Sequence, residues 1–308
     1  MYYDLITLLG PTASGKTALA VRLAQHLNAE ILSADSRQVY RGMDIGTGKD
    51  LTDYKINGNT VPYHLIDIVN AGTRYDVYQY QRDFLRAYQD IKVRGKNALL
   101  CGGSGMYIEA VTKGYALPNV PPDEALRASL DNKSMEELTA YLQSLKKTHN
   151  KTDMDTRKRV IRAIEIELFF QKHPRETFEY PVIKNSYIGL NLPREMRRER
   201  ITARLHQRLK EGMVEEAEQL LQQGVSIDDM LFYGLEYKYL ALFLTGSLSY
   251  DEMVRQLNTA IHQFAKRQMT WFRGMERRGN TIHWIDATLS ITEQVAQAVE
   301  IISEKNQV

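Results

Sequence analysis

The chain has 308 residues, of which 43% are hydrophobic, so it is long enough for one large domain or two modest ones with a buried core. Forty lysines and arginines against 38 aspartates and glutamates leave a formal net charge of +2, and this balance does not by itself indicate a nucleic-acid partner. A single cysteine, Cys101, excludes an internal disulfide and every cysteine-cluster metal site, and its apolar neighbours predict a buried thiol. Since no basic and apolar leader precedes the first strand, and no apolar run approaches the ~20 residues of a membrane span, we expect a cytoplasmic protein without a membrane partner.

A strand, a glycine loop and a helix come first along the chain. An apolar run over residues 4–9 predicts the strand, and apolar residues at helical spacing continue to about Leu27. Two glycines in the intervening segment G-P-T-A-S-G-K-T let the backbone aim several N–H groups at one phosphate, Lys16 adds a positive charge, and Thr17 can hold Mg²⁺ through its hydroxyl. The predicted phosphate-binding residues are Gly10, Thr12, Ala13, Ser14, Gly15, Lys16 and Thr17.

A carboxylate stands at the end of the second predicted strand. Residues 30–33 form that strand, and Asp35 follows it. Asp35 can bind Mg²⁺ beside the phosphates, act as a general base toward an incoming nucleophile, or simply cap a turn. Thr47 and Lys49 add a hydroxyl and a cation in another glycine-rich turn. His64, beside an apolar run, suits a structural histidine at least as well as a site residue.

The alternation of strands and helices continues. An amphipathic pattern from Val77 predicts a helix that ends at Gly95, residues 98–101 predict a core strand, and residues 102–105 turn that strand into a further helix. Such alternation is typical of a parallel sheet, whose ligand crevice lies beyond the carboxyl ends of the strands. We therefore expect the phosphate loop, Asp35 and Ser104 to converge.

Three prolines, at residues 118, 121 and 122, interrupt the alternation. The segment that follows is charged and helical without a strand, so we assign residues 116–154 to a small helical insertion whose core is too thin to fold alone. A helix over residues 156–170 and a strand over residues 187–192 come next. Residues 1–115 and 155–308 are predicted to form one core.

Long helices dominate from Arg194 onward. Arginines at 197, 200, 204 and 208 recur on one face of the first of them, a pattern that suits either a phosphate clamp or a solvated surface. Residues 251–278 predict a long helix with an apolar stripe and a cationic side. Its lysines and arginines lie near Trp271 and Phe272, a combination that suits RNA, although such aromatic residues more often belong to a core.

Six motifs, taken in order, resemble those of the tRNA dimethylallyltransferases. They are Gly10–Thr17, Asp35–Tyr40, Arg41–Thr47, His64–Asp67, Gly102–Tyr107 and Ala265–Arg273. The resemblance runs from the first strand to about Arg278 and implies an α/β, parallel-sheet P-loop nucleotide-hydrolase-like core with a helical C-terminal half. Members of this family use Mg²⁺ and transfer a dimethylallyl group from dimethylallyl diphosphate to N6 of the adenosine 3′-adjacent to the anticodon in tRNA.

The resemblance also implies roles for residues of this chain. The phosphate loop would hold the diphosphate leaving group, with Lys16 and Arg200 stabilising its charge and Thr17 on the metal. Thr12 and Asp35 would lie at the reacting amine, with Asp35 as the general base. The insertion would grip the tRNA anticodon stem-loop, and the enzyme is expected to act as a monomer. The residues expected to contact tRNA are Ser36, Gln38, Thr47, Lys49, Lys266, Arg267 and Arg273.

The chain departs from the family pattern in its RNA-facing half. Residues 232–238 read F-Y-G-L-E-Y-K where the family has Ile-Gly-Tyr-Lys-Glu, and Ile261-His262 replaces Thr-Arg. Three other functions stay open. A nucleotide or small-molecule kinase shares the phosphate loop, an adenylate dimethylallyltransferase would suit the short insertion, and a non-catalytic RNA-binding protein would not need to keep Lys16 and Asp35.

Overall fold

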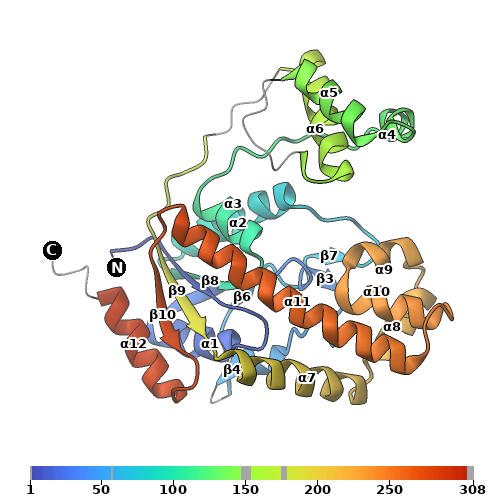
Figure 1. Cartoon of the computed structure of the whole chain (residues 1–308). Coiled ribbons are helices and arrows are strands. Elements are labelled where there is room, and N and C mark those ends of the chain that lie inside the picture. The colour runs from blue at the N-terminus through green and yellow to red at the C-terminus, as the bar shows by residue number, and fades with distance from the viewer. Residues whose placement is uncertain (1, 57, 147–153, 175–178, 304–308) are drawn as a thin grey trace. The chain divides into compact units, whose positions relative to one another are not determined.

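A six-stranded sheet forms the centre of the larger of two units in this computed structural model, which describes residues 2–56, 58–146, 154–174 and 179–303 (Figure 1). Its strands follow the order β10–β9–β1–β8–β2–β6, and every neighbouring pair is parallel. The predicted parallel sheet is therefore confirmed. The strands are β1 Leu5–Leu9, β2 Ala29–Ala34, β6 Tyr63–His64, β8 Asn97–Gly102, β9 Asn185–Asn191 and β10 Ile282–Asp286.

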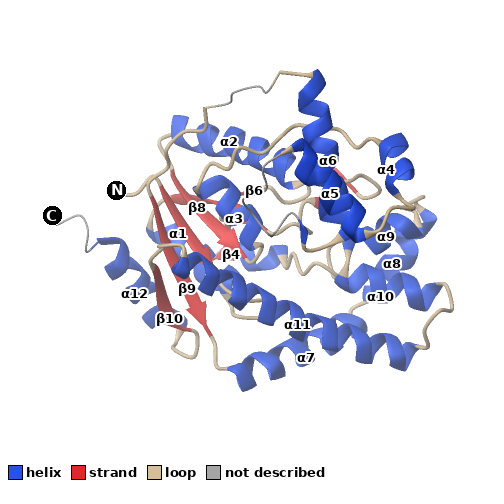
Figure 2. Cartoon of the chain, turned by 45° about the horizontal axis from the view of Figure 1, so that its top comes forward, coloured by secondary structure: helices blue, strands red, loops and turns tan. Residues whose placement is uncertain are grey.

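Helices cover both faces of this sheet (Figure 2). α1 (Lys16–His26) and α12 (Ile291–Ser303) pack against each other over one face, and their apolar side chains share a core with β1, β2 and β8. α2 (Val77–Val93) and α3 (Gly105–Thr112) pack together over the other. β1 lies between β8 and β9 with both of its faces covered, which explains why its sequence is an almost unbroken apolar run.

A helical half follows β9. It comprises α7 (Arg194–Lys210), α8 (Met213–Gln222), α9 (Ile227–Tyr233), α10 (Leu235–Leu244) and the long α11 (Tyr250–Arg277). α11 begins at a capping box and packs against α7, α10 and α3. β10, which follows α11 and adds an edge strand to the sheet, is not among the predicted elements, because His283 and Asp286 leave only a short apolar pattern.

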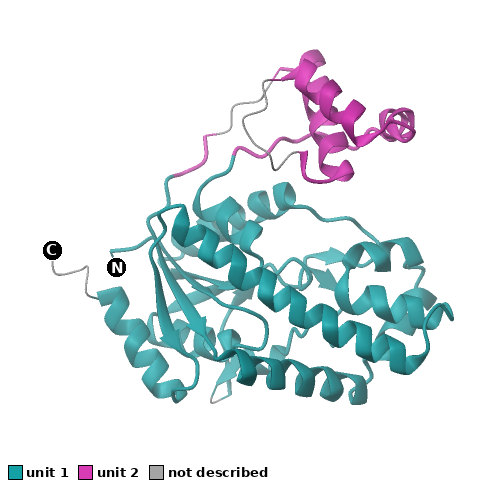
Figure 3. Ribbon diagram, viewed as in Figure 1, with its two compact units in different colours: residues 1–115, 182–308 teal, residues 116–181 magenta. Residues whose placement is uncertain are grey.

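The second unit spans Ala116–Pro181 (Figure 3). It contains α4 (Glu124–Leu130), α5 (Met135–Leu145) and α6 (Arg157–Lys172). The sequence predicts that the insertion ends at residue 154 and that the following helix, α6, belongs to the main core. The structure instead places α6 in the insertion, because its apolar face packs on α5 and the two helices share one small core. Residues 147–153, beside the predicted boundary, lie outside the described part of the chain.

Short elements fill the segment between β2 and α2. They are β3 Tyr40–Arg41, the 3-10 helix Leu51–Tyr54, β4 Lys55–Ile56, β5 Asn59–Thr60 and β7 Val69–Asn70. β3 pairs with β7 and β4 with β5, so this segment forms two small ladders beside the main sheet. Among the helices of the described residues, none combines the length and the apolar character needed to cross a bilayer.

Candidate active site

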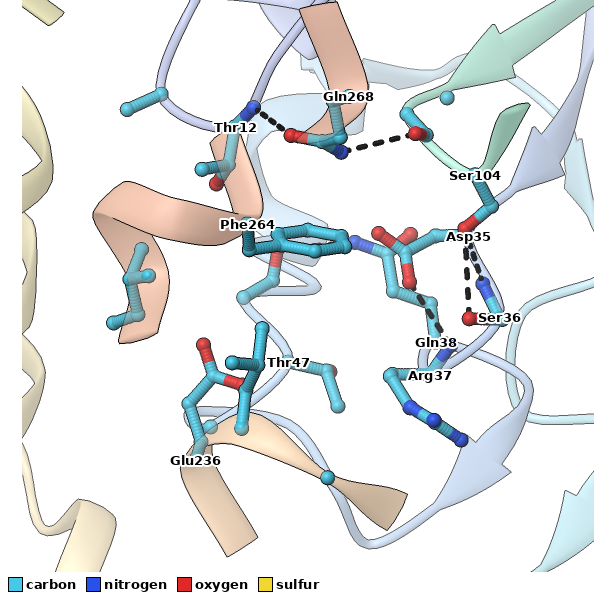
Figure 4. A pocket seen from close by; sticks show the side chains of 18 of the residues that line it. Thr12, Asp35, Ser36, Arg37, Gln38, Thr47, Ser104, Glu236, Phe264 and Gln268 are labelled. Carbon is cyan, nitrogen blue, oxygen red and sulfur yellow. Dashed lines mark hydrogen bonds between the residues drawn. The ribbon is translucent and has the colours of Figure 1, made fainter. Parts of the chain in front are cut away.

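A cavity of about 540 Å³ lies where β1, β2 and β8 end. The loop after β1, the turn after β2 and the turn after β8 all line it, which confirms the predicted convergence of the phosphate loop, Asp35 and Ser104 (Figure 4). Residues of α7, α10 and α11 complete the wall. The sequence-predicted residues that line the cavity are Thr12, Ala13, Lys16, Thr17, Asp35, Ser36, Gln38, Thr47 and Arg267.

The loop between β1 and α1 presents a cation and a helix N-terminus to the cavity. Gly15 takes a left-handed conformation, with φ of 88°, immediately before α1. The Lys16 Nζ donates to the Pro11 carbonyl at 2.7 Å, and burial lowers the pKa of Lys16 to about 8. An anion in this loop would favour the protonated lysine, so the loop suits a phosphate or diphosphate. Gly10, Ser14 and Gly15 shape the loop, whereas Thr12 and Ala13 line the cavity.

Asp35 fulfils one of the roles that the sequence left open, that of a turn residue, and it also lines the cavity. Its Oδ1 accepts a hydrogen bond from the Arg37 amide at 2.9 Å, which closes the turn after β2. The carboxylate also points into the cavity (Figure 4). The Ser36 amide donates to the Ser104 Oγ at 3.1 Å, which ties this turn to the one after β8. Asp35 is therefore a turn residue that also presents a fixed carboxylate to a ligand.

Gln268 of α11 joins two loops across the cavity (Figure 4). Its Oε1 accepts from the Thr12 amide at 2.8 Å, and its Nε2 donates to the Gly103 carbonyl at 3.0 Å. The role of Gln268 is not predictable from the sequence, because no local pattern reveals a contact with a residue 256 positions away. The ring of Phe264, one helical turn earlier, also lines the cavity.

Of the α7 arginines, Arg204 and Arg208 line the cavity and Arg200 does not. Arg200 is exposed on α7, so the prediction that it stabilises a leaving group in this cavity is wrong. Arg204 pairs with Asp50, and the Arg208 guanidinium lies against Gly48, where a Cβ would be 1.5 Å from its nearer amino nitrogen. Burial, with a contribution from Arg204, lowers the pKa of Arg208. Two neighbouring arginines therefore face the cavity together.

Lys49 does not face a ligand. It is 2% exposed, and its ammonium donates to the Tyr40 carbonyl and to Asp44, each at 2.6 Å, and to Asp67. The prediction that Lys49 contacts tRNA is therefore wrong, because its ammonium group is buried and already hydrogen-bonded to acceptors within the protein. His64 likewise bonds Glu30 at 2.7 Å, in agreement with the structural alternative.

The cationic side of α11 is exposed at Lys266, Arg267 and Arg273. Trp271 is tied to Glu109 through its Nε1 at 2.8 Å. His262 lies on another side, where its Nε2 is 3.2 Å from the Thr202 Oγ1 of α7. Burial and then Arg198 and Arg197 lower the pKa of His262.

A second carboxylate, Glu236 of α10, lines the same cavity. Its pKa is raised by burial.

Cys101 is buried at the site, as predicted, and burial raises its pKa to about 11. A thiol with this pKa is inert at neutral pH, so Cys101 supports no nucleophilic chemistry.

The donors around the loop fit a magnesium ion that is shared with phosphate oxygens. The described residues contain no group of three histidine, cysteine or acidic side chains that could hold a metal alone. The Thr17 hydroxyl and the Asp35 carboxylate, however, line one cavity. Mg²⁺ keeps several waters and takes one or two protein oxygens beside a substrate phosphate, so this sparse set is sufficient.

Comparison with known proteins agrees with this geometry. A family model described as IPP transferase matches residues 38–275. The chain belongs to this family. The transferase is 61% identical to tRNA dimethylallyltransferase 2 of Bacteroides fragilis, over 95% of this chain and 96% of that protein. It is 58% identical to tRNA dimethylallyltransferase 1 of Parabacteroides distasonis, over 98% and 99%.

A solved structure supports the same assignment. The transferase matches the crystal structure of the full-length tRNA isopentenylpyrophosphate transferase from Bacillus halodurans with a TM-score of 0.71 and 30% identity. The match covers 98% of this chain and 96% of that one. The α/β class of the fold is thus shared with a solved member of the family.

Proposed function

We propose that this prenyltransferase moves a dimethylallyl group from dimethylallyl diphosphate to N6 of the adenosine 3′-adjacent to the anticodon in tRNA, and releases diphosphate. The observation that carries the proposal is that a phosphate-binding loop and a fixed carboxylate line one cavity beside the exposed cations of α11. Its relatives named tRNA dimethylallyltransferase include proteins that are 57–61% identical to it over most of its length.

The diphosphate would lie between the phosphate loop and α7. The α1 N-terminus and Lys16 face it from one side, and Arg204 and Arg208 from the other. As the bond between the allylic carbon and oxygen breaks, its electron pair stays with diphosphate, and these cations stabilise the growing negative charge. Arg204 replaces Arg200 in this role.

The acceptor amine would lie beside Asp35. The N6 lone pair forms the new bond to the allylic carbon, and the amine then loses one proton to the Asp35 carboxylate. The bond from the Arg37 amide fixes this carboxylate before the substrate arrives. Thr12, a residue of the phosphate loop, lines the cavity and is assigned to the same reacting centre.

Magnesium would be held by Thr17, with Asp35 close by, and when bound it neutralises diphosphate charge. The chain's own residues bind the leaving group, orient the amine and accept its proton. We assign Ser36, Gln38 and Thr47, which line the cavity, to the RNA base, and Lys266, Arg267 and Arg273 to RNA phosphates. The second unit is proposed to contact the anticodon arm, and the enzyme to act as a cytoplasmic monomer.

One assay tests the proposal against its alternatives. The protein and Mg²⁺ are incubated with dimethylallyl diphosphate or ATP, and with tRNA or AMP, and the nucleosides are then weighed by mass spectrometry. We expect a gain of one dimethylallyl group on tRNA adenosine. Transfer to AMP but not tRNA would favour the adenylate enzyme, phosphoryl transfer from ATP would favour a kinase, and tRNA binding without any transfer would favour a non-catalytic protein.

A further inference from the structure

A loop over residues 43–49 forms one wall of the cavity through Gly46, Thr47 and Gly48. A single carboxylate from outside the loop, that of Glu216 on α8, accepts three consecutive backbone amides of this loop. Asp44 donates to Oε2 at 2.8 Å, Ile45 donates to Oε2 at 2.7 Å, and Gly46 donates to Oε1 at 2.9 Å. Bonds to a charged acceptor are stronger than neutral ones, so this arrangement fixes the backbone of the loop.

Tyr237 of α10 completes the arrangement. It is buried, and its hydroxyl donates to the Glu216 Oε1 at 2.6 Å. Gly46 lies directly on its ring, where an added Cβ would be 2.7 Å from the ring carbon that carries the hydroxyl. Tyr237 therefore orients the carboxylate and also supports the loop from below. Two helices of the C-terminal half thus hold a loop that comes from the N-terminal half.

The far end of the loop is held differently. Buried Lys49 bonds Asp44, and the Gly48 amide donates to the Asp44 carbonyl at 2.9 Å. The Gly48 carbonyl accepts from the Gln38 Nε2 at 3.1 Å, which joins the loop to the turn that contains Asp35. Lys49 and Gln38 thus secure Gly48 near the arginines, whereas Glu216 secures residues 44–46.

We propose that Glu216, oriented by Tyr237, is a positioning residue for the acceptor. It holds residues 44–46 so that Gly46 and Thr47 form the wall against which the RNA base lies, beside Asp35. The inference rests on the proposed function and extends it to residues that do not touch the substrate. Because the diphosphate side is secured separately, loss of Glu216 weakens use of the acceptor and leaves use of the donor intact.

The test compares Glu216→Gln and Tyr237→Phe with the parent enzyme and with Glu218→Gln, a control at an exposed position of the same helix. Glutamine keeps the size of the side chain but replaces one carboxylate oxygen by an amide NH2 group. This group donates hydrogen bonds and cannot accept one from a backbone amide. We expect the KM for an anticodon stem-loop to rise roughly 10- to 100-fold in Glu216→Gln and roughly 2- to 10-fold in Tyr237→Phe. The KM for dimethylallyl diphosphate, and inhibition by inorganic diphosphate, should match those of the control.

A merely structural role would lower the thermal midpoint and the amount of active enzyme, and so reduce kcat with both KM values unchanged. That result, or a stem-loop KM equal to that of Glu218→Gln, overturns the inference. If Glu216→Gln does not fold, Tyr237→Phe decides, because it keeps the ring beneath Gly46. A parent enzyme that transfers no dimethylallyl group contradicts the proposed function itself, and the two failures are therefore distinguishable.

Discussion

Asp35 shows how one side chain serves both the fold and the chemistry. Asp35→Asn keeps an oxygen that can accept from the Arg37 amide, so the turn should survive while the base is lost. We expect the single-turnover rate to fall roughly 10²- to 10⁴-fold with little change in tRNA affinity. Measuring the rate and the affinity on one preparation checks this, and a rate near that of the parent would remove Asp35 from proton transfer.

Lys16 should make donor binding depend on pH. Its pKa in the ligand-free protein is lowered to about 8 by burial, so above this pH the free enzyme has lost the charge that attracts diphosphate. Affinity for dimethylallyl diphosphate should therefore be full below pH 8 and fall as the pH rises through it. Titration calorimetry from pH 6.5 to 9.5 measures this effect. In Lys16→Ala the step near pH 8 should vanish, and its persistence would assign the step to another group.

At the scale of the element, α7 offers a matched pair of arginines one helical turn apart. Arg204 lines the cavity and Arg200 does not. Arg204→Ala should weaken inhibition by inorganic diphosphate by about 10-fold or more, since a hydrogen bond to a charged group contributes on the order of 1.5–3 kcal/mol. Arg200→Ala should be inhibited by inorganic diphosphate to the same extent as the parent enzyme. The reverse order would restore the role predicted for Arg200 and contradict the one given to Arg204.

The exposed cations of α11 should make RNA binding depend on salt. Each contact between a cation and a phosphate steepens the slope of log affinity against log salt by roughly 0.7 to 0.9. Lys266→Ala and Arg273→Ala should each flatten the slope by about that amount. His262→Gln serves as the control, because His262 faces α7, and its slope should equal the parent's. Equal slopes in all variants would move the RNA surface away from this helix.

The same helices show what a sequence can and cannot reveal. The phosphate loop, the turn at Asp35 and the alternation of strands and helices from β1 to α3 are predictable, because each depends on residues close together in the chain. Which of Arg200, Arg204 and Arg208 reaches the cavity depends on how α7 is rotated against its neighbours, and the repeat itself does not encode that rotation. The inward direction of Lys49 follows from Asp67, a partner supplied by another loop.

At the scale of the whole molecule, the chain divides into two compact units, each with its own apolar core. Leu138 of α5 is fully buried in the core of the second unit, so Leu138→Ala should lower its free energy of unfolding by about 2–5 kcal/mol. A decrease of this size in the free energy of unfolding is large for so small a core. We therefore expect Leu138→Ala to unfold the second unit while the first stays folded. Hydrogen exchange should show the change within residues 116–181.

In the same variant, tRNA affinity should fall while binding of dimethylallyl diphosphate is retained. The matched control is Gln143→Ala, at an exposed position of α5. Unchanged tRNA affinity with the second unit unfolded would show that the first unit recognises the anticodon arm alone.

The bond between the Thr12 amide and Gln268 has a consequence for synthesis of the protein. The phosphate loop follows β1, but β1 needs β9 beside it, and the loop needs Gln268, which lies 256 residues further along the chain. A nascent chain of which only the first half has emerged from the ribosome therefore contains the phosphate-loop sequence but lacks the residues that complete the site. Contacts between residues so distant in sequence also slow folding. We therefore expect that nearly the whole polypeptide must be synthesised before the phosphate loop can bind a diphosphate, so partial chains should not compete with the finished enzyme for its substrates.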